Sequence, residues 1–195
     1  MVLVIDNYDS FTYNLVQYLG EMTSVEVVRN DKIELTEIED MAPDQIVISP
    51  GPGRPEDAGI SSRVFEHFSG SIPLLGVCLG HQCLGEVLGG RVIKSDEIYH
   101  GKTSDIFLPA GRSERSSPDL FSGISSPFRA TRYHSLILEK KSLPAELDIL
   151  AETRRGEVMA AGHKKFPAFG LQFHPESILT DQGRKMLENF LSMTA

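Results

Sequence analysis

The sequence predicts a single α/β domain with an open, mostly parallel sheet that is flanked by helices and carries an antiparallel extension. Short apolar runs alternate with helix-like segments through the first half, the second half is rich in strand patterns, and no repeat or linker divides the 195 residues. A content of 41% hydrophobic and 24% charged residues is ordinary for a globular protein. Residues 1–195 are therefore expected to form one domain.

The first half alternates between strand and helix. Strands are expected where short runs are rich in Val, Ile and Leu, at residues 1–6, 25–30, 45–50 and 72–78. Helices are expected between these runs and after the last one, at residues 12–20, 35–41, 61–69 and 79–89. This alternation is typical of a parallel sheet with helical crossovers.

The second half is mostly strand. Apolar and alternating patterns predict strands at residues 91–96, 103–109, 128–138, 147–153, 157–164 and 169–175. Residues 183–193 form an amphipathic segment and are expected to be a helix. Its core-facing side chains are Met186, Leu187, Phe190 and Leu191.

Charge and cysteine content exclude several classes of function. The formal net charge is −8 and no basic run exceeds two residues, so a surface that binds nucleic-acid phosphates is not expected. The first segment reaches Asp6 too early for a signal-peptide core, and no apolar stretch could span a bilayer. Cys78 and Cys83 are too close for an ordinary disulfide. A cytoplasmic protein with no nucleic-acid or membrane partner is expected.

Cys78 directly ends a predicted strand, and glycines stand two residues before and after it. Gly76 and Gly80 lack the Cβ atoms that would clash in a tight turn from strand to helix. The G-x-C-x-G pattern is therefore typical of a nucleophile placed at a helix N-terminus, where the helix dipole favours the thiolate. A small cysteine packed in the core is the alternative that this pattern alone leaves open.

A cysteine nucleophile needs a base, and His174 is the candidate. It is expected to end an alternating strand, Pro175 holds it in an extended conformation, and the carboxylate of Glu176 is positioned to orient the imidazole. A solvated turn is the alternative for these three residues in isolation. None of the other histidines has a carboxylate placed in this way. We expect His67 and His163 on the surface, and structural or supporting roles for His81, His100 and His134.

Attack on a carbonyl group also requires N–H donors for the oxyanion. The backbone N–H of Leu79, the residue after the nucleophile, is one candidate. The second is expected from the segment SPGPGRPEDAG, whose glycines permit unusual backbone angles, and Gly51 and Gly53 are the candidates there. A surface turn is the alternative reading of this segment.

Six segments, in order, resemble the class I, triad-type glutamine amidotransferases. GVCLGHQ, SPGPG and GLQFHPES are similar to the signature segments of that family, and DNYDSFTYNL, HGKTS and RYHSL are similar to the branch that serves chorismate-using synthases. The resemblance extends from Met1 to the C-terminal helix. It implies a flavodoxin-like fold and the amidotransferase subunit (component II) of anthranilate synthase or of aminodeoxychorismate synthase.

The resemblance also implies a role for each matching residue. Cys78 would attack the side-chain amide of glutamine, Leu79 and Gly51 would stabilise the oxyanion, and His174, oriented by Glu176, would protonate the departing ammonia. The residues that would hold glutamine are Gly51, Pro52, Gly53, Gln82, Ser135 and Leu136. No metal or organic cofactor is implied.

Ammonia requires an acceptor, so the resemblance implies a chorismate-using synthase subunit (component I) as a protein partner. The residues assigned to the surface that faces it are Tyr8, Phe11, His100 and Lys102. Ordinary turn and strand-end residues are the alternative for these four positions. Two other functions remain open: an amidotransferase or γ-glutamyl hydrolase of the same fold with a different product, and a non-catalytic subunit that binds glutamine.

Overall fold

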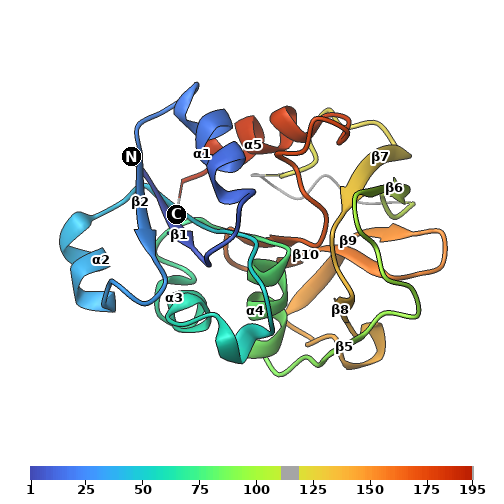
Figure 1. The fold of residues 1–195 in the computed structure, drawn as a ribbon, viewed down its shortest axis with the longest axis horizontal. Helices are drawn as coiled ribbons and strands as arrows, with labels where there is room; N and C mark the ends of the chain where they lie inside the picture. Colours follow the sequence, from blue (N-terminus) through green and yellow to red (C-terminus); the bar gives the residue numbers. More distant parts are fainter. Residues whose placement is uncertain (111–118, 195) are drawn as a thin grey trace.

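The computed structural model describes residues 1–110 and 119–194, and within them the chain is built around a nine-stranded mixed sheet (Figure 1). The strands lie in the order β2 (Val25–Arg29), β1 (Val2–Asp6), β3 (Gln45–Ile48), β4 (Leu74–Val77), β11 (Ala168–Leu171), β10 (Val158–His163), β9 (Leu147–Thr153), β6 (Lys102–Phe107) and β7 (Phe128–Arg132). The first five run parallel to their neighbours, and every later pairing is antiparallel. The predicted parallel sheet with an antiparallel extension is confirmed.

Helices cover both faces of the parallel part of the sheet. Figure 1 shows α1 (Thr12–Gly20) and α5 (Gly183–Leu191) on one face, and α3 (Ser61–Phe68) and α4 (Leu79–Val87) on the other with α2 (Leu35–Met41). Strand β1 explains why both faces are covered: Val2 and Val4 pack in the core cluster beneath α1 and α5, whereas Leu3 and Ile5 pack in the opposite cluster. Its uninterrupted apolar run is therefore buried on both sides.

The remaining elements are short. A second, two-stranded sheet pairs β5 (Val92–Lys94) with β8 (Leu136–Leu138), and two short 3₁₀ helices cover Pro55–Asp57 and Lys140–Ser142. In α5, Met186, Leu187 and Phe190 are fully buried and Leu191 is partly buried against them, as the pattern of that segment predicts. None of the helices in the described residues is long and apolar enough to cross a membrane.

Two strand predictions are wrong in extent. The run 128–138 is not one strand, because β7 ends at Arg132 and β8 begins at Leu136 in the other sheet. The carbonyl groups of His134 and Ser135 accept hydrogen bonds from the segment that precedes β6, so this stretch leaves the main ladder. Strand β11 also ends at Leu171, and His174 therefore lies three residues beyond it rather than at its end.

The surface position expected for His163 is also wrong. His163 is buried at the end of β10 because the following turn folds over it: its Nδ1 accepts the backbone N–H groups of Lys165 and Phe166, and its ring stacks on Phe166 at 4.7 Å between centroids. His67 is exposed on α3, as expected, and pairs with Glu39.

Candidate functional site

The site lies where four neighbouring parallel strands end at the same edge of the sheet, the usual position of ligand sites in open α/β sheets. Strands β1, β3, β4 and β11 are adjacent, and their ends lie within one residue of each other in register. Val77 of β4 pairs with Leu171 of β11, and the N–H of Cys78 donates to the Leu171 carbonyl oxygen at 2.7 Å. This pairing brings the segment that leads to His174 beside Cys78.

Cys78 has an unusual backbone conformation, with φ 52° and ψ −97°, directly before the first turn of α4. Positive φ is strained for a residue with a Cβ atom, and such strain is typical of functional turns. A Cβ atom on Gly76 would lie 2.3 Å from the carbonyl carbon of Gly80, and one on Gly80 would lie 2.6 Å from the Ile48 carbonyl oxygen. Both glycines are thus required by this elbow, residues 76–80.

His174 and Glu176 form a buried pair. The Nδ1 atom of His174 lies 2.6 Å from Oε1 of Glu176, and both side chains are almost completely inaccessible to solvent. Burial alone lowers the pKa of His174, but the carboxylate of Glu176 and the sulfur of Cys78 raise that pKa well above its ordinary value. These neighbours therefore favour the protonated form of the ring.

Nε2 of His174, the ring nitrogen that Glu176 does not contact, is buried without a hydrogen-bond partner. The ring is held edge-on by Phe11 and Tyr133, at 5.3 and 5.2 Å between centroids. Because Glu176 takes Nδ1, Nε2 is the ring nitrogen that remains for proton transfer beside Cys78.

The other buried histidines near the site are uncharged. Burial lowers the pKa of His81 to about 4, and burial together with the charge of Arg132 lowers the pKa of His134 to about 3. His134 Nε2 accepts a hydrogen bond from Nε of Arg132 at 3.0 Å, which requires a neutral ring. Among these three rings, only His174 has neighbours that raise its pKa above the ordinary value.

A pocket of about 180 Å³ is lined in part by Cys78. All the residues that the resemblance assigns to glutamine binding line it, together with Cys78, Leu79, Tyr133 and His134. Gln82 also fixes the wall of the pocket. The Nε2 atom of Gln82 donates to the carbonyl oxygen of Leu136 and to Oε1 of Gln172, both at 3.1 Å. The β7–β8 connection thus meets the elbow across one small cavity.

Sequence reasoning missed two residues at this site. Gln172 is fully buried, and its Nε2 donates to Sγ of Cys78 at 3.6 Å. Its position two residues before His174 was a usable signal, since i and i+2 side chains of an extended segment share a face. Tyr133 packs on His174 and lines the pocket, and no feature of the sequence distinguishes it from its neighbours.

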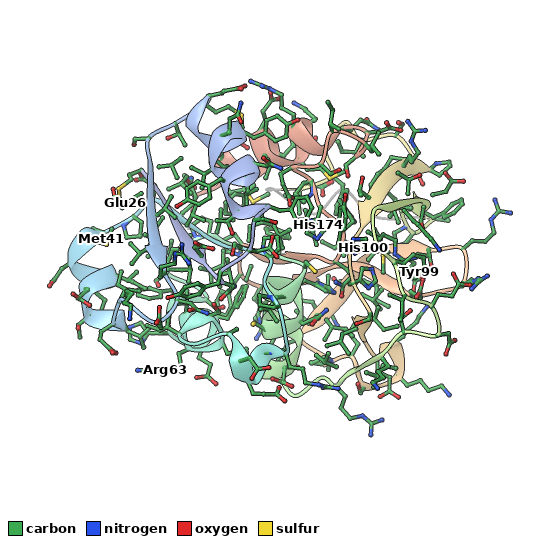
Figure 2. All side chains as sticks on the ribbon, viewed as in Figure 1. Glu26, Met41, Arg63, Tyr99, His100 and His174 are labelled. Atoms are coloured by element: carbon green, nitrogen blue, oxygen red, sulfur yellow. The ribbon has the colours of Figure 1, made fainter. Side chains whose placement is uncertain are left out.

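Two of the four residues assigned to a partner surface contact Tyr133 of the site. Phe11 and His100 both contact the ring of Tyr133, at 4.6 and 5.7 Å between centroids. Figure 2 shows His100 and His174 on the same side of the molecule. Tyr8 is half-exposed and donates its hydroxyl to Asp31 at 2.7 Å, and Lys102 is exposed at the start of β6.

The second thiol is chemically different. Cys83 is fully buried within α4, and burial raises the pKa of its thiol to about 12. Across residues 1–110 and 119–194, no group of three His, Cys, Asp or Glu side chains is arranged to hold a metal ion.

Comparisons with known proteins agree on a family. The family model described as Glutamine amidotransferase class-I matches residues 3–193. The chain is 52% identical over 192 residues to aminodeoxychorismate/anthranilate synthase component 2 of Bacillus subtilis, covering 98% of this chain and 95% of that protein. It is 53% identical over 195 residues to the bifunctional protein TrpGD of Thermotoga maritima, but it spans only 32% of that protein.

A solved structure shows the same fold. A glutamine amidotransferase from Thermotoga maritima superposes with a TM-score of 0.75 and 16% identity, over 97% of this chain and 95% of the other.

Proposed function

This chain belongs to the class I glutamine amidotransferase family, and from that membership we propose that it hydrolyses L-glutamine and supplies the ammonia to a chorismate-using synthase subunit. One observation carries the proposal: the strained Cys78, the buried His174–Glu176 pair and a pocket of about 180 Å³ meet at one edge of the sheet. A nucleophile, a proton carrier and a substrate cavity are the parts that amide hydrolysis needs.

In the first step, the thiolate of Cys78 attacks the side-chain carbonyl carbon of glutamine. A carbon–sulfur bond forms, and the carbonyl oxygen becomes an oxyanion. The backbone N–H groups of Leu79 and Gly51 are the proposed donors to that oxygen, because Leu79 opens α4 and Gly51 borders the same pocket.

In the second step, His174 passes its proton to the amide nitrogen, the carbon–nitrogen bond breaks, and ammonia leaves. A γ-glutamyl thioester remains on Cys78. Neutral His174 then takes a proton from water, the resulting hydroxide attacks the thioester, and glutamate leaves as the thiolate is restored. The hydrogen bond that Nδ1 of His174 donates to Glu176 keeps the ring in position throughout, since it occupies Nδ1 and leaves Nε2 for these transfers.

The acceptor of the ammonia is a separate subunit in this proposal. We assign anthranilate synthase as the main acceptor and aminodeoxychorismate synthase as the alternative, and the name of the Bacillus subtilis relative joins both activities. The subunit that purifies with this chain, and the product formed from chorismate and glutamine, distinguish the two.

The test of the proposed function is Cys78→Ser in the complex with the synthase subunit. Glutamine-dependent synthesis should be lost while synthesis from added ammonium salts persists, because the acceptor chemistry belongs to the other subunit. Cys83→Ser is the matched control and should retain both activities. Loss of both activities by an assembled Cys78→Ser complex, or survival of the glutamine-dependent one, contradicts the proposal.

We further propose that the partner docks around the opening of the site and activates it. The support is the position of Phe11 and His100 against Tyr133, which itself packs on His174. Glutamate release by the isolated chain should be slow and should rise when the synthase subunit and chorismate are added. His100→Ala and Lys102→Ala should weaken this response.

Arg63→Ala provides the control for the docking surface, because Arg63 is exposed on α3 and lies far from His100 in Figure 2. If the His100 and Lys102 variants bind and respond to the partner as Arg63→Ala does, the assigned surface is wrong. If the isolated chain hydrolyses glutamine as fast as the complex, activation by the partner is wrong.

A further inference from the structure

Asn7 is a buried polar residue at the same sheet edge that the proposed reaction leaves without a role. It directly follows β1, next to the end of β3, and its side chain is 3% exposed. The following residue, Tyr8, has a φ of 63°, so the chain turns sharply after Asn7 and Tyr8 points outward. The turn separates an inward amide from an outward aromatic ring.

The amide of Asn7 is held by hydrogen bonds from three directions. Its Oδ1 accepts from Nδ2 of Asn30 at 2.9 Å and from Oγ of Ser61 at 2.7 Å, while its Nδ2 donates to the carbonyl oxygen of Ser49 at 2.9 Å. Both lone-pair positions of Oδ1 and one N–H are used, which fixes the orientation of a buried amide. Asn7 thus ties the end of β3 to β2 and to the start of α3.

A second contact connects Asn7 to the loop at residues 49–53, which we call the oxyanion loop. The backbone N–H of Asn7 donates to Oγ of Ser49 at 2.8 Å, and that hydroxyl in turn donates to the carbonyl oxygen of Pro50 at 2.7 Å. This short chain of hydrogen bonds ends at the peptide group that joins Pro50 to Gly51. The orientation of that peptide group sets the direction of the Gly51 N–H.

Gly51 packs directly on Asn7. A Cβ atom on Gly51 would lie 2.5 Å from Cβ of Asn7, 3.0 Å from its carbonyl oxygen and 2.7 Å from Cδ2 of Leu79. The Gly51 backbone therefore packs against Asn7 and Leu79, and no space for a side chain remains between them. Leu79 supplies the other proposed oxyanion donor, so Asn7 lies behind one half of the proposed oxyanion hole.

We propose that Asn7 is a positioning residue for the oxyanion hole: it holds the oxyanion loop so that the Gly51 N–H is directed at the carbonyl oxygen of the substrate. This inference rests on the proposed function. Oxyanion donors act only when they are aligned beforehand, and a displacement of about 1 Å costs about 100-fold in rate. Asn7 acts through Ser49 and Gly51, and it does not touch the substrate itself.

The test compares Asn7→Ala with Ser61→Ala in the complex with the synthase subunit. Both variants break a hydrogen bond of the same amide, but only Asn7→Ala removes the donation from Nδ2 to the carbonyl oxygen of Ser49, the residue that begins the oxyanion loop. For Asn7→Ala, kcat for glutamine hydrolysis should fall by about 10- to 100-fold while KM changes by less than about threefold. Ser61→Ala should keep kcat within about twofold, even where its thermal stability falls equally.

Two further measurements separate positioning from general damage. Alkylation of Cys78 by iodoacetamide needs no oxyanion donor, so its rate should be unchanged in Asn7→Ala. Ammonium-dependent synthesis by the complex should also be unchanged. A parallel loss of alkylation, or an equal loss of kcat in Ser61→Ala, shows a merely structural role and overturns the proposal.

Asn7→Asp covers the case in which Asn7→Ala does not fold. It keeps the shape of the side chain but removes the N–H that donates to Ser49, and its kcat should fall as that of Asn7→Ala does. A native kcat in Asn7→Asp overturns the inference. Failure of the proposed function is distinguishable, because glutamine-dependent activity would then survive in Cys78→Ser whatever Asn7 does.

Discussion

Replacing Gly76 with alanine should displace the elbow from the strand that carries it. The added Cβ atom would lie 2.3 Å from the carbonyl carbon of Gly80, 2.4 Å from its oxygen and 2.8 Å from the backbone nitrogen of His81. All three are backbone atoms, so no rotation of a side chain relieves the overlap. Because ordinary contact begins at 3.4 Å, the first turn of α4 has to move by about 1 Å.

That displacement predicts a defined loss of activity. The turn carries the N–H of Leu79, and a misplacement of about 1 Å in a reacting geometry costs about 100-fold in rate. Overpacking of a close-packed core lowers the free energy of unfolding by about 1–3 kcal/mol. We therefore expect Gly76→Ala to fold, to be less stable by that amount, and to lose about 100-fold in kcat for glutamine hydrolysis.

Gly20→Ala is the matched control for this experiment. Gly20 is the last residue of α1, and a Cβ atom there would meet nothing within 4 Å. This variant should keep full activity and gain about 0.4–1 kcal/mol in the free energy of unfolding, because alanine restricts the unfolded chain. The measurements are glutamate release and urea unfolding. A Gly76→Ala protein with native stability and a kcat within a few-fold of native would refute the reasoning.

Two further predictions concern a buried histidine and the second thiol. Burial lowers the pKa of His81 from 6.5 to about 4, so the unfolded state binds a proton more readily between these values and stability decreases as the pH falls through that window. The difference between these two pKa values corresponds to about 3 kcal/mol in the free energy of unfolding. Urea titrations of His81→Asn should therefore show a weaker pH dependence of stability between about pH 6.5 and 4 than the native chain, and equal slopes would contradict this. Burial raises the pKa of the Cys83 thiol to about 12, so a glutamine-like chloroketone should label Cys78 alone. Peptide mapping that found Cys83 modified as readily would show that the assignment of the nucleophile is wrong.

The layered fold was predictable because burial on two faces leaves a simple pattern. The parallel strands β1, β3 and β4 are buried at every residue, and they appear in the sequence as unbroken apolar runs. The bounds of α1 and α2 match the predicted 12–20 and 35–41, since both segments alternate apolar and polar residues with a helical period. Local pattern was sufficient for these elements.

Strand neighbours were not predictable in the same way. Nothing in residues 168–171 shows that they pair with β4, about ninety residues earlier in the chain, and yet this pairing brings Cys78 beside the segment that carries His174. The break after Arg132 was hidden for a related reason. Alternation indicates which face of a strand is covered. The break depends instead on which backbone N–H groups donate to its carbonyl oxygens, and those N–H groups lie in the segment before β6.

The segment DNYDSFT shows that a resemblance assigns one role to a whole segment, whereas burial distinguishes the roles of its individual residues. The resemblance pointed the whole segment toward a partner, and Tyr8 is indeed half-exposed. Asn7 is buried beside it, because the positive φ of Tyr8 reverses the direction of the chain between the two side chains. Asn7 directly follows a predicted parallel strand, and the same criterion selected Cys78, so this position was visible in the sequence. What the sequence lacked was the contact with Gly51, whose missing Cβ atom is what allows the oxyanion loop to pack on Asn7.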